Sequence, residues 1–187
     1  MICRPTLSHH GSNRPLYVFW IAILASGLLV AIPASAITRH DMNLPEERVI
    51  AACIHRAAHG HVWLEKTLWG LRDQEAGWIG AAIPNANGTY DLGPLQINSW
   101  WVPRLASLLD RSSGDVTHWL RNDACFNAEA ARWIFLSGLA STGSFWKAIG
   151  AYHSPTSFRQ RSYASAVAKH LGRRFGPDVF TPPSSRR

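Results

Sequence analysis

The chain is poor in charged residues, and acidic residues are the scarcer sign. Charged residues make up 17% of the 187 residues and hydrophobic residues 47%, which excludes a globally disordered chain and permits a packed core. Twelve Asp and Glu stand against 19 Lys and Arg, for a formal net charge of +7. Such a balance suits an anionic partner. The cationic residues form no stripe and no nucleic-acid motif, so we do not expect nucleic acid to be that partner.

Motifs of several large enzyme classes are missing from the sequence. It contains no Gly-x-Ser-x-Gly element and no phosphate-binding loop. His55, His59 and His61 lie close together and raise the question of a metal site. No glutamate lies between His55 and His59 in the zinc-protease pattern, however, and no fourth ligand is evident. We therefore predict neither a metal nor another cofactor.

A long hydrophobic run occurs only near the start of the chain. Arg4 and Arg14 precede a run from Leu16 to Ile32 that carries no charge, and the small residues Ala34-Ser35-Ala36 follow. This is the three-part pattern of a secretory signal. We predict that residues 1–36 are a signal peptide, removed after Ala36, and that the protein is exported. An uncleaved membrane anchor is the alternative.

Cysteine is also scarce, and its distribution predicts one disulfide. Cys3 lies in the predicted signal, so the exported chain retains Cys53 and Cys125 as an even pair. In an oxidising compartment such a pair favours a disulfide over two buried thiols. Closing a loop of about 72 residues would stabilise the fold by about 4 kcal/mol in the chain-entropy model.

The rest of the chain indicates one mainly α-helical domain over residues 37–176. There is no internal repeat and no second domain, and residues 177–187, rich in Pro and Ser, are predicted to be a disordered tail. Apolar spacing and capping residues predict a series of helices. The predicted helices cover about 44–60, 64–75, 99–109, 115–120, 122–136, 144–151 and 155–171, with Asp115 and Ser144 as helix caps.

The exception to the helical pattern is the segment 83–98. Asn87-Gly88 is a strong turn signal, and Thr89 and Tyr90 favour extended backbone. We expect a short β-hairpin or an irregular flap here.

Glu75 is the candidate general acid. It continues a helical stripe of leucines formed by Leu64, Leu68 and Leu71, near a helix end expected at Gly77. A carboxyl group against an apolar surface has a raised pKa, so it can hold a proton near neutral pH and donate it to a leaving group. The alternatives are a glutamate at the surface, or a carboxylate paired with Arg72 or Arg104.

The turn that follows Glu75 ends in two amides, Gln96 and Asn98, whose donors and acceptors suit sugar hydroxyl groups. Asn98 can instead cap the next helix. Gly93 permits close backbone approach. Asp91 could be a second catalytic acid, but next to Gly93 we favour a role in organising the turn.

Tryptophans lie near these residues in the sequence. Trp78 follows Glu75, and Trp100 and Trp101 follow the turn. Indole rings stack on sugar faces, although most tryptophans in a small helical domain belong to the core. We assign at most one or two of them to substrate.

Four segments together resemble the lytic transglycosylases of the lysozyme-like superfamily. Gln74-Glu75-Ala76-Gly77 corresponds to the helix that carries the family's glutamate. Residues 85–98, Asn-Ala-Asn-Gly-Thr-Tyr-Asp-Leu-Gly-Pro-Leu-Gln-Ile-Asn, match the family's most specific element almost throughout. Ala148 to Ser154 resembles its Ala-Tyr element, and the stretch from Gln160 to Ala164 also looks familial.

The resemblance implies a compact lysozyme-like helical domain and a periplasmic enzyme acting on peptidoglycan glycan strands. Glu75 would be the sole acid/base, and Gln96, Tyr152 and Asn98 would line the saccharide site. The implied reaction cuts the bond after N-acetylmuramic acid and leaves a 1,6-anhydro end. The nearest likeness is to small members that accompany conjugation, type IV pilus and secretion machines, whose components are the implied partners.

The sequence departs from the family pattern at three places. Ala76 stands where serine is usual, Pro94-Leu95 where Leu-Met is common, and His153-Ser154-Pro155 where Asn-x-Gly is more frequent. Two other functions stay open at this point. One is a hydrolysing muramidase in which Asp91 positions a water, and the other is a wall-binding scaffold that has lost activity.

Overall fold

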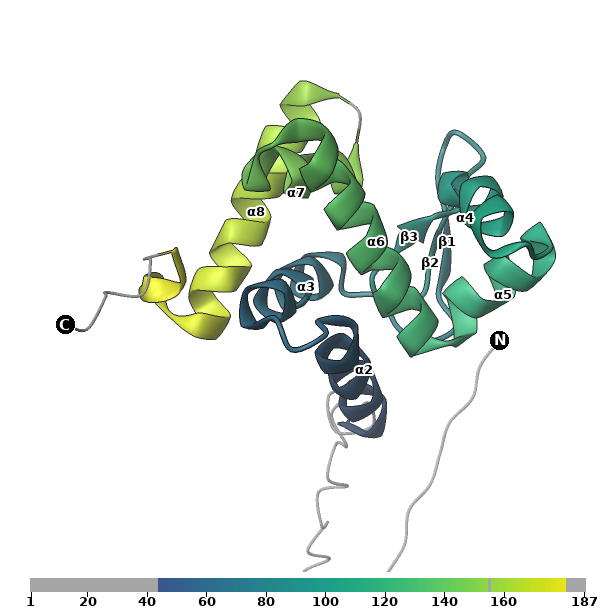
Figure 1. Ribbon diagram of the computed structural model, residues 1–187, viewed down its shortest axis with the longest axis horizontal. Coiled ribbons are helices and arrows are strands. Elements are labelled where there is room, and N and C mark those ends of the chain that lie inside the picture. The colour runs from purple at the N-terminus through teal and green to yellow at the C-terminus, as the bar shows by residue number, and fades with distance from the viewer. Residues whose placement is uncertain (1–43, 155, 181–187) are drawn as a thin grey trace, which may run out of the picture. The chain divides into compact units, whose positions relative to one another are not determined.

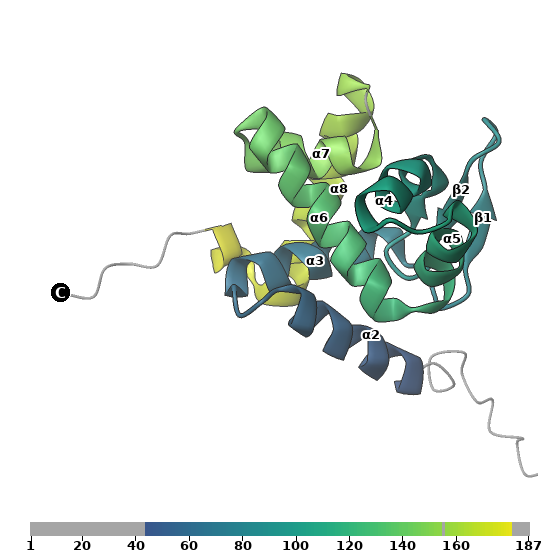
Figure 2. The same ribbon diagram turned by 45° about the vertical axis from the view of Figure 1, so that its right-hand side comes forward.

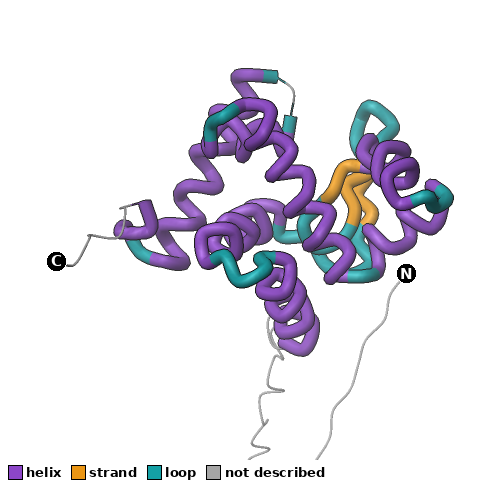
Figure 3. The backbone as a smooth tube through the Cα atoms, in the orientation of Figure 1, coloured by secondary structure: helices purple, strands orange, loops and turns teal. Residues whose placement is uncertain are grey.

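The computed structural model describes residues 44–154 and 156–180 (Figure 1), and the predicted signal peptide lies outside them. This part of the chain contains seven α-helices and a small three-stranded antiparallel sheet (Figure 3). The helices are α2 (Leu44–Ala57), α3 (Val62–Glu75), α4 (Val102–Leu109), α5 (Ser113–Asn122), α6 (Ala124–Thr142), α7 (Phe145–His153) and α8 (Ser157–Phe175). The strands are β1 (Ala82–Pro84), β2 (Tyr90–Leu92) and β3 (Ile97–Asn98), and two 3-10 helices are η1 (Ser99–Trp101) and η2 (Pro177–Phe180). The sheet lies at one side, beside α4 and α5 (Figures 1 and 3). The prediction of a mainly α domain with a small β flap around 83–98 is confirmed.

Several helix boundaries differ from the prediction. Helix α5 begins after Ser112, whose hydroxyl accepts from the Asp115 N–H and donates to the Asp115 carboxylate. The cap is therefore Ser112, and the prediction that Asp115 is the cap was wrong. Helix α6 continues to Thr142 and ends where Gly143 takes the left-handed conformation. Helix η2 lies within the predicted tail, so helical structure extends beyond Gly176. None of the described helices has the length and apolar content needed to cross a membrane.

Helix α6 is the central element, and it packs against α2, α5 and α7 (Figure 2). The inner face of α3 packs on α8, and its leucine stripe of Leu64, Leu68 and Leu71 is at most 2% exposed. A Cβ added at Gly70 would lie 2.8 Å from Leu171 on α8, so the two helices approach closely. This approach brings α8 alongside the end of α3 that carries Glu75.

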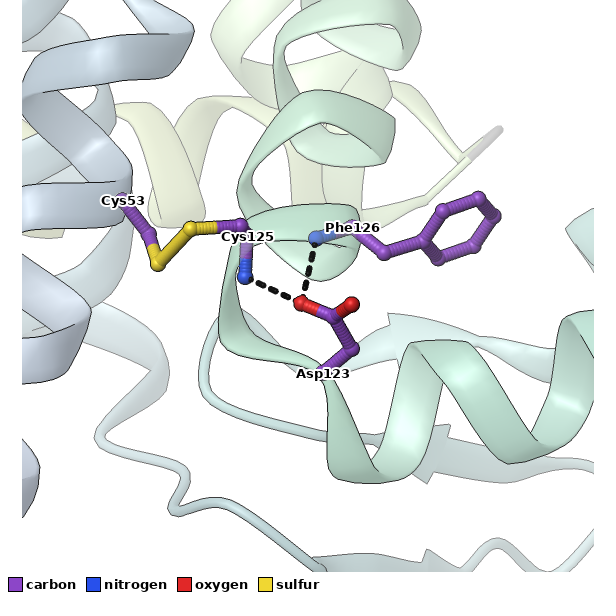
Figure 4. The surroundings of a disulfide bond; sticks show 4 residues. All are labelled: Cys53, Asp123, Cys125 and Phe126. Carbon is purple, nitrogen blue, oxygen red and sulfur yellow. Dashed lines mark hydrogen bonds between the residues drawn. A yellow bond between two sulfur atoms is a disulfide. The ribbon is translucent and has the colours of Figure 1, made fainter.

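The predicted disulfide is present. Cys53 in α2 bonds to Cys125 in the first turn of α6, with 4.5 Å between the two Cα atoms (Figure 4). Asp123 caps the same turn by accepting hydrogen bonds from the Cys125 and Phe126 N–H groups (Figure 4). The bond therefore ties the first described helix to the central one, and the alternative of two buried thiols is wrong.

The flap contains three strands and is held against the helices by one buried amide. Strand β2 pairs with both β1 and β3. The fully buried Asn127 of α6 donates to the Leu92 and Leu120 carbonyls and accepts from the Leu95 N–H. Gly93 has a φ of +69°, and a Cβ there would lie 2.1 Å from the Leu120 carbonyl oxygen. The close approach expected at Gly93 is thus confirmed, and the approaching group is the end of α5.

Candidate active site

Glu75 is the last residue of α3, and the chain turns away immediately after it. Ala76 takes the left-handed conformation with a φ of +50°, and its N–H bonds to the Arg72 carbonyl. The helix thus ends two residues before Gly77, where the prediction placed the end. This conformation is uncommon for a residue with a Cβ. The bend places the partly buried Glu75 carboxyl at the end of the apolar stripe.

The surroundings of Glu75 favour its protonated form. Burial raises the pKa of its carboxyl from 4.5 to about 7, the hydrogen bond donated by Tyr163 to Oε1 lowers this pKa, and the negative charge of Asp91 raises it. A carboxyl group with a pKa near 7 can donate a proton at neutral pH and take it back later.

The cations that could have neutralised Glu75 lie elsewhere. Arg72 pairs with Glu47, and the Arg104 guanidinium lies 5.5 Å from the centroid of the Trp133 ring. The alternative of a carboxylate paired with either arginine is therefore wrong.

Gln96 lies against the turn that follows Glu75. Its Nε2 donates to the Gly93 carbonyl at 2.7 Å, and a Cβ added at Gly77 would lie 2.6 Å from the same Nε2. Gln96 lies in the tight turn between β2 and β3 and has a φ of +48°. In the described part of the chain its second N–H and its Oε1 make no other hydrogen bond. The structure thus brings the predicted acid and the predicted amide together.

Asn98 has a capping role. Its Oδ1 accepts from the Trp100 N–H, and its Nδ2 donates to Thr89 Oγ1 at 3.0 Å and to Asp91 Oδ1 at 2.8 Å. The interpretation as a helix cap is confirmed, and both amide N–H groups are used within the flap. A contact between Asn98 and a substrate stays a prediction.

Asp91 holds the sheet together and also faces the site. It lies in β2, opposite Asn98 in β3, and accepts the hydrogen bond that joins the two side chains. Burial lowers the pKa of His153 and the negative charge of Asp91 opposes that shift, whereas for Glu75 and Tyr152 burial raises the pKa and Asp91 raises it further. Its structural role is therefore to join β2 to β3, whereas the prediction placed that role in the turn at Gly93.

Three stacked rings, those of Tyr152, Tyr163 and His153, lie beside Glu75 and the flap. Tyr152 donates to the Leu95 carbonyl at 2.8 Å and so braces the turn next to Gln96. The Tyr163 ring lies 6.5 Å from the Tyr152 ring and 4.6 Å from the His153 ring, with which it is nearly parallel at 2°. Burial raises the pKa of both tyrosine hydroxyls well above 10, so both remain hydrogen-bond donors near neutral pH.

Tyr163 and His153 received no role from the sequence. Tyr163 precedes Val167 and Leu171 at intervals of four residues, which is the pattern of a core position, and all three are buried. The only available signal was the place of Tyr163 in the familial stretch from Gln160 to Ala164.

The tryptophans divide into exposed and packed rings. Trp78 is 50% exposed and Trp100 is 66% exposed, so each of the two indole rings is accessible to a sugar. Trp101 packs edge-on between Trp100 and Trp133, which assigns it to the core.

Two of the three clustered histidines hydrogen-bond to carboxylates from other helices. His55 bonds to Glu65 at 3.0 Å and His59 to Glu129 at 3.1 Å. Among the described residues, no group of three or more His, Cys, Asp or Glu side chains is placed to hold a metal ion.

The Tyr163→Phe variant tests how Glu75 is tuned. Removing the hydroxyl removes a hydrogen bond that lowers the pKa of Glu75, so this pKa is expected to rise. Any activity that needs protonated Glu75 should then persist to higher pH. The measurement is the pH profile of activity for the variant beside the wild type. An unchanged alkaline limb would contradict the assigned hydrogen bond.

Comparison with known proteins gives low but extended similarity. No family model matches the chain. The chain is 26% identical over 126 residues to protein IpgF of Shigella flexneri, which covers 67% of this chain and 80% of IpgF. It is 30% identical over 105 residues to invasion protein IagB of Salmonella typhimurium and of Salmonella typhi. This aligned region covers 56% of this chain and 62% of IagB. The chain is thus similar to IpgF and to an invasion protein over much of its length.

Proposed function

We propose that the protein is a peptidoglycan lytic transglycosylase with Glu75 as its single acid/base. The observation that carries this proposal is the partly buried Glu75 carboxyl, with a pKa raised to about 7, beside the Tyr163 hydroxyl and the Gln96 turn. A glycosidic oxygen is a poor leaving group that needs a proton as the bond breaks, and Glu75 can supply it at neutral pH.

The second half of the reaction requires Glu75 to act as a base. After losing its proton, Glu75 would remove one from the 6-hydroxyl of N-acetylmuramic acid, and that oxygen would close the 1,6-anhydro ring. The proton then returns to Glu75, so atoms and charges balance without a nucleophilic water. Tyr163 supports this step because its donated hydrogen bond stabilises the ionised carboxylate.

The flap and the rings would hold the sugar. Gln96 offers an N–H and an oxygen to sugar hydroxyl or N-acetyl groups. Tyr152 fixes the turn that carries Gln96, since its hydroxyl bonds to the Leu95 carbonyl. Trp78 and Trp100 present exposed indole faces near the two ends of this segment of sequence.

The alternative chemistry is hydrolysis, in which Asp91 positions a water molecule. Asp91 acts electrostatically on Glu75, which is the observation that favours this reading. One Asp91 oxygen already bonds to Asn98, however, and ties the carboxylate to the sheet. We therefore place the lyase reaction first and the hydrolysing muramidase second.

We also propose the compartment in which the enzyme acts and the machinery that it serves. The secretory signal pattern supports a periplasmic setting, in which the enzyme would open the wall locally for a secretion or conjugation apparatus. The similarity to invasion protein IagB is compatible with such a role. Components of that apparatus would be its partners.

Mass spectrometry of peptidoglycan digested by the purified protein tests the reaction. We expect fragments that end in 1,6-anhydro-N-acetylmuramic acid. Fragments with reducing ends would show a hydrolase instead. Intact strands after prolonged digestion would indicate a wall-binding scaffold that has lost activity.

A further inference from the structure

The last helical part of the protein carries one sign of charge. The sequence contains no Asp or Glu from residue 130 to residue 177, a stretch that includes α7 and α8. Arg174 finds a carboxylate in α3, through its bidentate bond to Asp73. Lys147, Arg161 and Lys169 form no ion pair with any described residue. All three residues are exposed, so a ligand can reach their positive charge.

Two of these cations line a hollow between α7 and α8, which lie side by side in both ribbon views (Figures 1 and 2). The hollow has a volume of about 310 Å³. Trp146 and Lys147 line it from α7, and Arg161 lines it from α8 together with alanines at positions 164 and 168. Trp146 is 40% exposed, and its ring meets Phe145 edge-on at 4.9 Å. The site thus combines an aromatic wall and small apolar side chains with two cations.

The hollow and the candidate active site both involve one turn of α8. Gln160 and Ala164, which line it, lie three residues before and one residue after Tyr163. One helical turn rises only about 5.4 Å, so the hollow and the Tyr163–Glu75 contact share a turn of α8. A Cβ added at Gly150 would lie 2.6 Å from the Gln160 Cβ, so α7 closes on α8 two residues before Tyr152.

We propose that this hollow, defined by Trp146, Lys147, Arg161 and the alanines of α8, binds a carboxylate of the peptide stems carried by the glycan strand. The proposal rests on the proposed function, since it concerns the same polymer. Each stem joins the glycan at N-acetylmuramic acid, the sugar cut at Glu75, and it combines short apolar side chains with carboxylates. Lys147 and Arg161 would pair with the carboxylate, while Trp146 and the alanines would pack on the apolar part.

The shape of the site decides between this ligand and a lipid surface. A hollow between two helices takes an inserted group, whereas a bilayer is a broad surface that a projecting apolar face meets best. Specificity for strands that still carry stems follows, because removal of a stem takes away its apolar side chains and its carboxylates and leaves only the lactyl carboxylate on the sugar itself.

The test uses the full-length purified protein and two forms of its substrate. Strands with stems are compared with strands from which an amidase has removed them. For the Lys147→Gln/Arg161→Gln variant, KM on strands with stems is expected to rise roughly fivefold, while kcat stays within about twofold. KM on stripped strands should not change. The control Arg48→Gln/Arg111→Gln removes the same charge from exposed positions on α2 and just after α4, and should leave both KM values unchanged.

Several results would overturn the proposal. They are an equal rise in KM on both substrates, no rise on either, or a loss of binding to vesicles of anionic lipid with KM unchanged. The last result would assign the hollow to a membrane. Should the wild type cleave neither substrate, the proposed function fails, and direct binding decides the role of the hollow. A soluble stem tripeptide should then shift the Trp146 indole NMR signal in the wild type and leave it unshifted in the double variant, and a wild-type signal that does not move would refute the site.

Discussion

Replacement of Glu75 by Gln is expected to lower the rate of glycan cleavage by at least about a thousandfold, within the range that a general acid supplies. Gln has the size of Glu and can still accept the Tyr163 hydrogen bond, but it cannot donate a proton to the leaving oxygen or take one from the sugar. Zymography and product release from purified peptidoglycan measure the loss. Glu65→Gln is the matched control, because Glu65 lies in the same helix and bonds to His55.

The same variant is expected to be more stable than the wild type at alkaline pH. Below pH 4.5 the Glu75 carboxyl is protonated in both the folded and the unfolded chain. Between pH 4.5 and about 7 the folded chain keeps a proton that the unfolded chain has lost, so stability falls as pH rises. Above pH 7 the carboxyl is ionised in both states, and burying its charge lowers the free energy of unfolding by up to about 3 kcal/mol. Glu75→Gln removes this cost.

Clearing by Glu75→Gln equal to that of the wild type would reject Glu75 as the acid.

Loss of the disulfide is the second large effect. Replacing Cys53 and Cys125 together by Ala is expected to lower the free energy of unfolding by about 4 kcal/mol, because the 72-residue separation leaves a large loop open in the unfolded chain. Urea unfolding of the double variant at fixed pH gives the value.

Reduced wild-type protein serves as the comparison, because it loses the same cross-link without a change of side chain. Both should unfold at a lower urea concentration than the oxidised protein. A difference under about 1 kcal/mol would mean that the fold is held by the packing of α2 on α6, with little contribution from the covalent link.

Local patterns in the sequence were sufficient for much of the fold and for part of the site. The leucine stripe of α3 follows from helical spacing alone, and the next position on that stripe is the candidate acid, Glu75. The Asn87-Gly88 turn and the two cysteines likewise needed no knowledge of distant contacts. Helix caps were less certain, because Ser112 and Asp115 compete for one helix start and only the backbone geometry decides between them.

Contacts between distant parts of the chain could not be predicted in this way. Tyr163 meets Glu75 across 88 positions, and Asn127 reaches Leu95 across 32. Both side chains occupy helix positions whose spacing indicates core packing, so their polar atoms carry no local signal. The roles of Tyr163 in tuning the acid and of Asn127 in fixing the flap appear only when the helices are placed in space.

The most direct measurement is the titration of the Glu75 side chain by carbon NMR. With the carboxyl carbons labelled, the Glu75→Gln spectrum identifies the signal of Glu75. We predict that this signal titrates with a pKa of about 7, since burial disfavours the charged form. A midpoint near the ordinary value of 4.5 would show a carboxylate that is ionised at neutral pH, and would contradict its role as the proton donor.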